Sequence, residues 1–291
     1  EATIGLALRK EAEKNGAIVT VADGDEPVAA LDLYNFATEL SFEVVSIGKG
    51  KNNPFNRFAT PDLLAKEASS KKMNPKMLTS FVDGSKTMVE MAALANFLDF
   101  KIDVDGMHGI EATYENINQY YIPKKDGGLL ESTQVVDFAF GIAPGVFAVI
   151  YSEDDYVNYE MEYLKMGKGP FWTLARPYHL TSLEIPRTIR HIMLENYSKL
   201  SAKSWNVEVV TYAKQHIEPG TNLGSIGGDY IYGKAQKVSS SKGLLPLGIA
   251  EDNIVNKVIK KGDPLKAHDI DAQDNALCEY WNMQNQIMNS D

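Results

Sequence analysis

The sequence predicts an α+β protein, with a mixed-sheet domain flanked by helices followed by a small all-β domain. Up to about residue 200, apolar strand-like runs alternate with segments of helical periodicity, which is typical of packed helix and sheet layers. Beyond that point short alternating runs and turn residues dominate. We therefore predict an α+β domain for substrate binding and dimerisation over 1–200, a β domain over 201–274, and a tail over 275–291.

The first domain is predicted to begin with a strand–helix–strand unit. A helix over 2–15 precedes a strand over 17–22, a helix over 28–40 and a strand over 42–47. Loops that follow strands in open sheets are common ligand sites, so the residues after 47 are candidate ligand-binding residues.

Two apolar runs at 135–140 and 145–151 predict a buried hairpin or adjacent strands of one sheet. A helix over 155–166 and a strand over 171–175 should follow. Thr181-x-x-Glu184 has the spacing of a capping box and predicts a helix over 183–196.

The β domain carries a weak internal repeat. The pattern Ile-x-x-Gly-x-x-Leu occurs at 217–223 and at 259–265, after strand-like runs at 207–212 and 254–258. Because the pattern is short, a chance repeat is the alternative. The amide-rich tail predicts a short helix or a disordered segment.

Composition narrows the class of partner. A net charge of −10 argues against nucleic acid and anionic membranes as main partners, which favours a small-molecule substrate. The single cysteine, Cys278, excludes an internal disulfide and fits a reducing compartment. The most apolar run, 135–151, is too short and too interrupted to span a bilayer, and no signal peptide is evident at the start. We expect a cytoplasmic protein.

The stretch 167–186 places a cation and an imidazole, Arg176 and His179, where a predicted strand leads into a helix N-terminus. Helix N-termini attract anions through free amide groups, so these two side chains are candidate anion ligands. The alternative is a structural loop in which the arginine pairs with a carboxylate and the histidine caps a carbonyl.

The segment 48–54 is the second candidate, because Lys49 and Lys51 alternate with glycines and precede Asn52. The spacing of a phosphate-binding P-loop is absent. The alternative is a solvated basic turn.

Asp83, Lys86 and Glu90 fall on one face of a predicted helix. In a cleft, Lys86 would serve as a proton donor and the carboxylates would hold it or a metal. The alternative is a row of surface ion pairs. His108, near Asp103 and Asp105, is a candidate for proton transfer or metal binding, with a plain turn as the alternative.

Several segments together resemble homoserine dehydrogenase-like oxidoreductases with a C-terminal SAF domain, in the deoxyxylulose-phosphate reductoisomerase-like group. They are Asp-Gly-Asp-Glu-Pro at 23–27, Val-Val-Ser-Ile-Gly-Lys-Gly-Lys-Asn-Asn-Pro at 44–54, Phe-Val-Asp-Gly-Ser-Lys-Thr-Met-Val-Glu-Met-Ala at 81–92, and Arg-Pro-Tyr-His-Leu-Thr-Ser-Leu-Glu at 176–184. Leu-Pro-Leu-Gly-Ile-Ala at 245–250 and Lys-Lys-Gly-Asp-Pro-Leu at 260–265 resemble the SAF β-clip.

The resemblance implies an NAD(P)-dependent oxidoreductase that acts on a small polar carbonyl or hydroxy compound, phosphorylated or not. Composition alone does not indicate this class of enzyme. The glycine-rich turn of a Rossmann lobe is absent, which implies that most NAD or NADP contacts lie outside this sequence and that the fragment alone is inactive. A descendant that has lost redox chemistry is the alternative.

The resemblance and the residue chemistry together give a set of predicted roles. The predicted catalytic residues are Lys49, Lys86, Asp83 and His108. The predicted substrate ligands are Lys51, Asn52, Ser85, Arg176 and His179, and the predicted cofactor contacts are Asp25 and Glu26. A divalent metal would use Asp83, Glu90 and Asp105. A homo-oligomer, most simply a homodimer, is expected. The alternatives are a non-enzymatic small-ligand or regulatory SAF protein, and a homoserine dehydrogenase proper.

Overall fold

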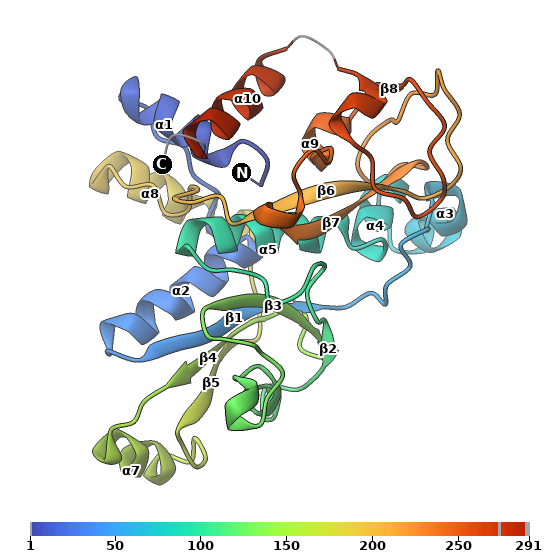
Figure 1. Ribbon diagram of the computed structural model, residues 1–291. Helices are drawn as coiled ribbons and strands as arrows, with labels where there is room; N and C mark the ends of the chain where they lie inside the picture. Colours follow the sequence, from blue (N-terminus) through green and yellow to red (C-terminus); the bar gives the residue numbers. More distant parts are fainter. Residues whose placement is uncertain (1, 273–274, 289–291) are drawn as a thin grey trace.

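The computed structural model describes residues 2–272 and 275–288 and is built on one mixed five-stranded sheet (Figure 1). The strands lie in the order β2-β3-β1-β4-β5, and β1 pairs parallel with β3 and antiparallel with β4. The predicted α+β class, with a mixed sheet and flanking helices, is confirmed. These strands are β1 Glu43–Lys51, β2 Ile110–Glu111, β3 Val135–Phe140, β4 Val146–Tyr151 and β5 Phe171–Arg176.

Helices cover both faces of this sheet. Figure 1 shows α2 and α5 along one face, where both contact β1, and α6 contacts β5. The α-helices are α1 Gly5–Lys14, α2 Glu26–Glu39, α3 Pro61–Ser70, α4 Pro75–Val82, α5 Ser85–Leu98, α6 Ile117–Tyr120, α7 Asp155–Tyr163, α8 Ile185–Glu195, α9 Leu247–Ala250 and α10 Ala276–Met288. The short 3-10 helices are η1 Lys124–Asp126, η2 Thr181–Glu184, η3 Val238–Ser240 and η4 Ala267–Asp269.

β1 contributes to a core on each face of the sheet. Val44 and Ile47 belong to the cluster that contains Met91 of α5, whereas Val45 belongs to the cluster that contains Tyr121. A register shift between Val44 and Ser46 interrupts the strict alternation of the strand, so Val45 and Ile47 lie on opposite faces although they are two residues apart.

The predicted pairing of 135–140 with 145–151 is wrong, although both runs are strands of the same sheet. They are β3 and β4, and β1 lies between them. Gly50 donates its backbone N–H to the carbonyl oxygen of Gly145 at 2.7 Å, so the connection between the two strands crosses the end of β1. β1 is buried at every position from Val44 to Lys51, as its central place in the sheet requires.

Two further local predictions are wrong. The segment 17–22 is not a strand, and it packs irregularly against 198–200, with Val21 N–H donating to the Leu200 carbonyl at 2.8 Å. Thr181 makes no capping bond, because it lies in a 3-10 helix with a positive φ, and α8 begins at Ile185.

The C-terminal region contains two small antiparallel pairs. They are β6 Val207–Ala213 with β7 Ile231–Lys237, and β8 Ile254–Val255 with β9 Ile270–Asp271. Both β6 and β7 contact α5, and α10 lies against α1 (Figure 1). The proposed boundary near residue 200 stays a prediction, as does the SAF assignment.

The two copies of the internal repeat face one another. Ile217 and Ile259 form an antiparallel bridge, and both side chains are buried. Gly220 and Gly262 share a left-handed backbone, with φ of +84° and +86°. Equivalent burial and equivalent turns at equivalent positions favour a structural repeat over a chance match.

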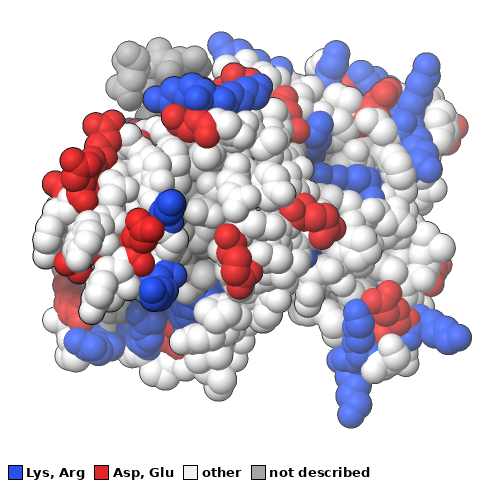
Figure 2. All heavy atoms as spheres, turned by 90° about the horizontal axis from the view of Figure 1, so that it is seen from below, with Lys and Arg blue, Asp and Glu red and all other residues white. Residues whose placement is uncertain are grey.

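Within the described ranges, no helix is both long enough and apolar enough to traverse a lipid bilayer. Figure 2 shows basic and acidic side chains interspersed over one face of the molecule, separated by large areas without charge.

Gly48 is required by the close approach of β1 and β3. A Cβ at this position would lie 1.7 Å from the carbonyl oxygen of Asp137. We expect Gly48→Ala to lower the free energy of unfolding by about 3 kcal/mol or more, because the backbone of the central strands must move. Urea unfolding followed by circular dichroism measures this change.

The matched control is Gly262→Ala, where a Cβ meets nothing within 4 Å and only the positive φ opposes it. We expect a cost of about 1–2 kcal/mol there. Equal costs at the two positions would contradict the close-approach explanation.

Candidate active site

Lys49 and Lys51 lie on the central strand, not in the loop that the sequence predicts. β1 extends through Lys51, and both side chains are only 5% exposed. Strand alternation places them on the face that Ile47 occupies, toward α2 and α5. Gly48 and Gly50 let the strand approach the backbone of Asp137 and Ala143 closely. The Gly-Lys-Gly-Lys pattern therefore indicates a crowded strand end and not a solvated turn.

Glu26 enters the site from the first turn of α2. Asp25 is the N-cap, and its Oδ1 accepts the Glu26 N–H at 3.2 Å. The partial positive charge of a helix N-terminus stabilises a carboxylate there. The local sequence therefore fixes where α2 begins and aims the Glu26 side chain at the sheet.

Lys86 and Glu90 come from the first two turns of α5. They are one helical turn apart, and their charged groups form an ion pair. Gly84 has a φ of +83° and ends the preceding helical segment, so α5 begins afresh at Ser85. The predicted shared face of Lys86 and Glu90 is thus correct, and it is turned toward β1.

These residues form one continuous chain of charges. Lys49 Nζ lies 2.8 Å from Glu26 Oε2 and also pairs with Glu90, which in turn pairs with Lys86. His179 extends the chain, with Nε2 lying 3.6 Å from Glu26 Oε1. The Lys49 side chain is 6% exposed and the Lys86 side chain 39%, so the chain runs from the protein interior to solvent.

The charges of this chain set the protonation of its members. Burial acts to raise the pKa of Glu26, but the charge of Lys49, a hydrogen bond from it and the charge of Lys86 bring it below its ordinary value. Burial acts to lower the pKa of Lys86, but Glu90 and Glu26 raise it overall. Both groups are therefore ionised throughout the neutral range.

Lys51 behaves differently. Burial, followed by the charges of Lys49 and Arg57, lowers the pKa of Lys51 to about 8. Its Nζ donates to the carbonyl oxygen of Phe81 and lies 4.8 Å from the centre of the Phe55 ring. A lysine with this pKa gives up and regains a proton near neutral pH.

A cleft of about 480 Å³ opens over this chain at the carboxyl end of β1. Its lining includes six residues with predicted roles: Glu26, Lys49, Lys51, Asn52, Lys86 and His179. Four lysines and one carboxylate are among the described residues that line it. The cleft therefore has the size and charge to hold a small anion.

The sequence analysis missed part of the cleft wall. Lys71, at the end of α3, and Phe81, in α4, both line it. Nothing distinguishes Lys71 locally from Lys72 beside it, so only the fold reveals its place. The phenyl ring of Phe81 lies 5.5 Å from Lys86 Nζ, where it supports the ammonium group.

Arg176 is not part of the cleft lining. It pairs with Glu184 and, at 3.3 Å, with Asp32. His179 Nδ1 lies 2.9 Å from the carbonyl oxygen of Gly24. The structural alternative therefore holds for Arg176, which pairs with carboxylates. His179 contacts a carbonyl oxygen and also lines the cleft. Lys49, Lys86 and Arg176 do not share one hollow.

Asp83 and Ser85 point away from the cleft, toward the C-terminal region. Asp83 Oδ1 accepts the Ser85 N–H at 2.8 Å, and Oδ2 forms a 2.8 Å ion pair with Lys214. Ser85 Oγ accepts the backbone N–H of Gly233 at 2.8 Å. Asp83 does not contact Lys86, because the left-handed turn at Gly84 leaves the two side chains pointing in different directions. These contacts tie the start of α5 to the β6–β7 pair.

His108 and Asp105 also lie outside the cleft lining. His108 Nε2 is 2.9 Å from Asp103 Oδ2, so the predicted carboxylate–histidine pair exists. Asp105 accepts the backbone N–H of Lys237 at 3.2 Å. The predicted metal set of Asp83, Glu90 and Asp105 is therefore not assembled.

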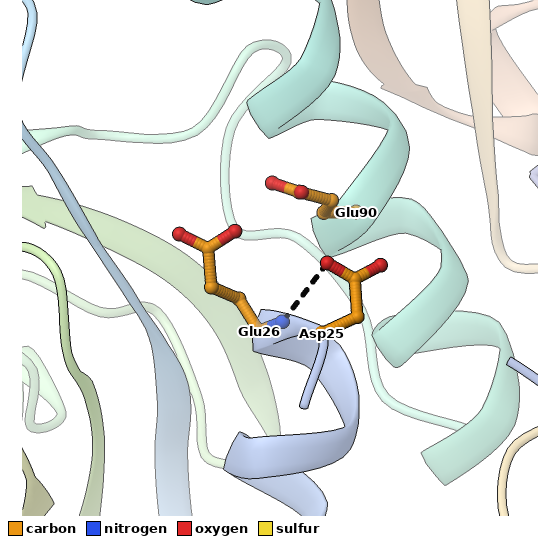
Figure 3. Close-up of side chains that lie close together, drawn as sticks. All are labelled: Asp25, Glu26 and Glu90. Atoms are coloured by element: carbon orange, nitrogen blue, oxygen red, sulfur yellow. Dashed lines mark hydrogen bonds between the residues drawn. The ribbon is translucent and has the colours of Figure 1, made fainter. Parts of the chain in front are cut away.

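A different set of carboxylates has metal-binding geometry. Asp25, Glu26 and Glu90 each offer an oxygen, and these oxygens lie within 4.8 Å of one another (Figure 3). Figure 3 shows the side chains of the α2 N-terminus turned toward Glu90 on α5. Hard carboxylate oxygens suit Mg²⁺ or Mn²⁺, but Lys49 and Lys86 already form ion pairs with these carboxylates, so a cation would compete with them.

Comparison with family models matches residues 24–185 to the catalytic domain of the oxidoreductase DRL family. The match covers more than half of the polypeptide and includes every residue of the row of alternating charges described above. The chain therefore belongs to the DRL oxidoreductase family, which confirms the predicted oxidoreductase class. No curated protein matches the sequence significantly.

The Asp83–Lys214 ion pair gives a structural prediction. Both side chains are buried, so Lys214→Met leaves a carboxylate without its partner and should lower the free energy of unfolding by about 3–5 kcal/mol. Asp83→Asn together with Lys214→Met removes both charges while retaining the Oδ1 that accepts from Ser85. We expect the double variant to regain about 1 kcal/mol or more, measured by urea unfolding.

The single Asp83→Asn variant closes the double-mutant cycle. Strict additivity of the two single changes would show that the ion pair contributes no coupling, and this would contradict its role as the link between α5 and the C-terminal region.

Proposed function

We propose that this protein is an NAD(P)-dependent oxidoreductase that interconverts a carbonyl and a hydroxyl group on a small phosphorylated compound. The observation that carries the proposal is the lysine-rich cleft over a buried chain of alternating charges, inside the catalytic domain of an oxidoreductase family. By resemblance, a deoxyxylulose phosphate is the first substrate to test, and homoserine is the competing one.

The substrate anion is held at the open side of the cleft. Lys86 remains cationic, because Glu90 and Glu26 raise its pKa, and its side chain is the most exposed of the charge chain. Lys71 adds a second cation across the opening, and Asn52 supplies an amide. A phosphate group suits this setting because it is small and doubly charged, and accepts several hydrogen bonds.

The proton is handled by Lys51. Reduction of a carbonyl needs a hydride at carbon and a proton at oxygen, and Lys51 Nζ–H supplies the proton before it is recharged from solvent. The pKa near 8 favours Lys51 for this role, whereas the raised pKa of Lys86 makes that residue a poor donor. The roles predicted from sequence for Lys51 and Lys86 are thus exchanged in this proposal.

The nicotinamide supplies or accepts the hydride when the coenzyme is bound. Lys49, fixed between Glu26 and Glu90, keeps the floor of the cleft rigid and charged. The choice between NAD and NADP, the predicted coenzyme contacts of Asp25 and Glu26, the divalent metal, the SAF module and the homo-oligomer all stay predictions. Exposed apolar side chains of α8, among them Ile189, Met193 and Leu194, support association with another surface.

The anion-binding part of the proposal predicts a ligand-dependent melting temperature. 1-Deoxy-D-xylulose 5-phosphate should raise the melting temperature, since it binds only the folded chain, and L-homoserine should not. We expect Lys86→Met to weaken this binding roughly ten- to hundredfold, because a charge-assisted hydrogen bond is lost. Differential scanning fluorimetry across a ligand titration measures both effects.

The matched control is Lys66→Met, which removes an exposed lysine of α3 that does not line the cleft. Equal binding in the Lys86→Met and Lys66→Met proteins would remove Lys86 from the site. A response to homoserine alone would favour homoserine dehydrogenase. Titrations with and without MgCl₂ show whether the Asp25, Glu26 and Glu90 carboxylates take up a cation that assists binding.

The catalytic part of the proposal predicts a pH dependence. Lys51 must be protonated to act as the acid, so the rate constant kcat/KM for carbonyl reduction should fall as pH rises through about 8. In the oxidation direction the neutral amine is required, and the rate should rise over the same range. The measurement is a steady-state pH profile of the holoenzyme in both directions.

Lys51→Met should lower kcat by about two orders of magnitude or more, the usual contribution of a general acid, and should abolish the limb near pH 8. Lys51→Arg keeps the charge but holds its proton too firmly, and it separates the two roles. An Arg variant with full activity and an unchanged profile would show that Lys51 binds the substrate without transferring a proton.

A further inference from the structure

A second and larger cavity, of about 650 Å³, lies at the opposite end of α5 from the cleft. It is bounded by Asp99, which caps the C-terminus of α5, by β6 and the segment after β7, and by α10. The cavity and the cleft share no lining residue. Lys86 and Asp99 are separated by most of the length of α5, which spans roughly 20 Å at 1.5 Å per residue.

Two indole groups line this cavity, and one of them lacks a hydrogen-bond acceptor. The Nε1 atoms of Trp205 and Trp281 are both buried; the Trp205 indole acts on the Glu208 carboxyl, whereas Trp281 Nε1 has no partner among the described residues. Trp205 is only 6% exposed, and both residues line the cavity. An indole N–H can only donate, and a buried donor without an acceptor costs free energy. The arrangement is one in which an acceptor brought by a ligand would be stabilising.

Glu208 lies beside the Trp205 indole. Its side chain is 2% exposed, and Oε1 accepts the backbone N–H of Val209 at 2.8 Å. Burial raises the pKa of Glu208 well above its ordinary value, against smaller lowering effects of the Val209 N–H and the Trp205 indole. The raised pKa reduces the negative charge that this buried carboxyl presents to an anion in the cavity.

The rest of the lining carries apolar and cationic groups. Val238, Leu244 and Pro246 supply apolar walls, and the indoles supply flat aromatic surface. Lys101, Lys237 and Lys242 also line the cavity, whereas Asp99 is the one acidic residue there besides the buried Glu208, counting described residues alone. The cavity thus combines aromatic surface, hydrogen-bond donors and an excess of positive charge.

We propose that this cavity is a second ligand site that binds a small aromatic anion. The ring packs against the indoles and the apolar wall, and an acceptor atom receives the Trp281 N–H group. The negative charge lies toward the lysines. The cavity volume is in the range of small-molecule sites, and an aromatic carboxylate and a mononucleotide share the required chemistry.

The tryptophans themselves report on this site. The sequence contains three tryptophans, and the third, Trp172, is fully buried in the sheet core. We expect benzoate or AMP to change the intrinsic fluorescence of the protein saturably, with excitation at the red edge of the indole band. Acetate, which lacks the ring, and benzyl alcohol, which lacks the charge, should produce no saturable change at the same concentrations. If only benzoate gives a saturable change, the ligand is an aromatic carboxylate. If only AMP gives one, the ligand is a mononucleotide.

Two variants locate the signal. Trp172→Phe leaves only the cavity tryptophans and should preserve the saturable change. Lys101→Met with Lys242→Met removes two exposed lysines of the lining and should weaken binding at least tenfold. The matched control, Lys10→Met with Lys125→Met, removes two exposed lysines outside the lining and should leave binding unchanged.

Several outcomes would overturn the proposal. They are the absence of a saturable response to both anions, an equal response to benzyl alcohol, and equal affinity in the two double variants. The melting temperature with and without the probes is the second readout, because a variant that fails to fold shows no transition at all.

Discussion

Two lysines on the central strand of the sheet, Lys49 and Lys51, set the constraint that the surrounding structure satisfies. A buried ammonium group costs several kcal/mol unless opposite charges and hydrogen bonds compensate it. Lys49 receives that compensation from Glu26 at the start of α2 and from Glu90 on α5. The positions of both helices relative to β1 are therefore tied to one ionic contact as well as to apolar packing.

The lysines of the cleft have different electrostatic surroundings, which is the basis of the two roles proposed for them. Lys86 lies between carboxylates, which favour its charged form, whereas Lys51 has cationic neighbours and a backbone carbonyl as its nearest acceptor. Identical side chains that line one cleft thereby acquire different proton affinities. In the proposed mechanism, environment rather than residue type decides which lysine holds the anion and which one exchanges a proton.

The start of α5 joins this cleft to the C-terminal region. On one side of the turn at Gly84, Lys86 and Glu90 face β1, and on the other Asp83 and Ser85 contact Lys214 and Gly233. Sequence periodicity groups Asp83 with Lys86 because it assumes one continuous helix. The left-handed glycine breaks the helix, and the two residues acquire separate roles that no spacing rule could assign.

The residue pattern by itself predicted the α+β class, the internal repeat at 217–223 and 259–265, and three of the cleft lysines, Lys49, Lys51 and Lys86. These features depend on local periodicity and on the chemistry of single side chains, which a sequence contains in full. Tertiary structure alone decided the insertion of β1 between β3 and β4, the pairing of Arg176 with Asp32, the place of Lys71 in the cleft, and the presence of Trp205 and Trp281 in one cavity. Each of these depends on contacts between residues far apart in the chain, whose partners are set by the global packing of the layers rather than by any neighbouring residue.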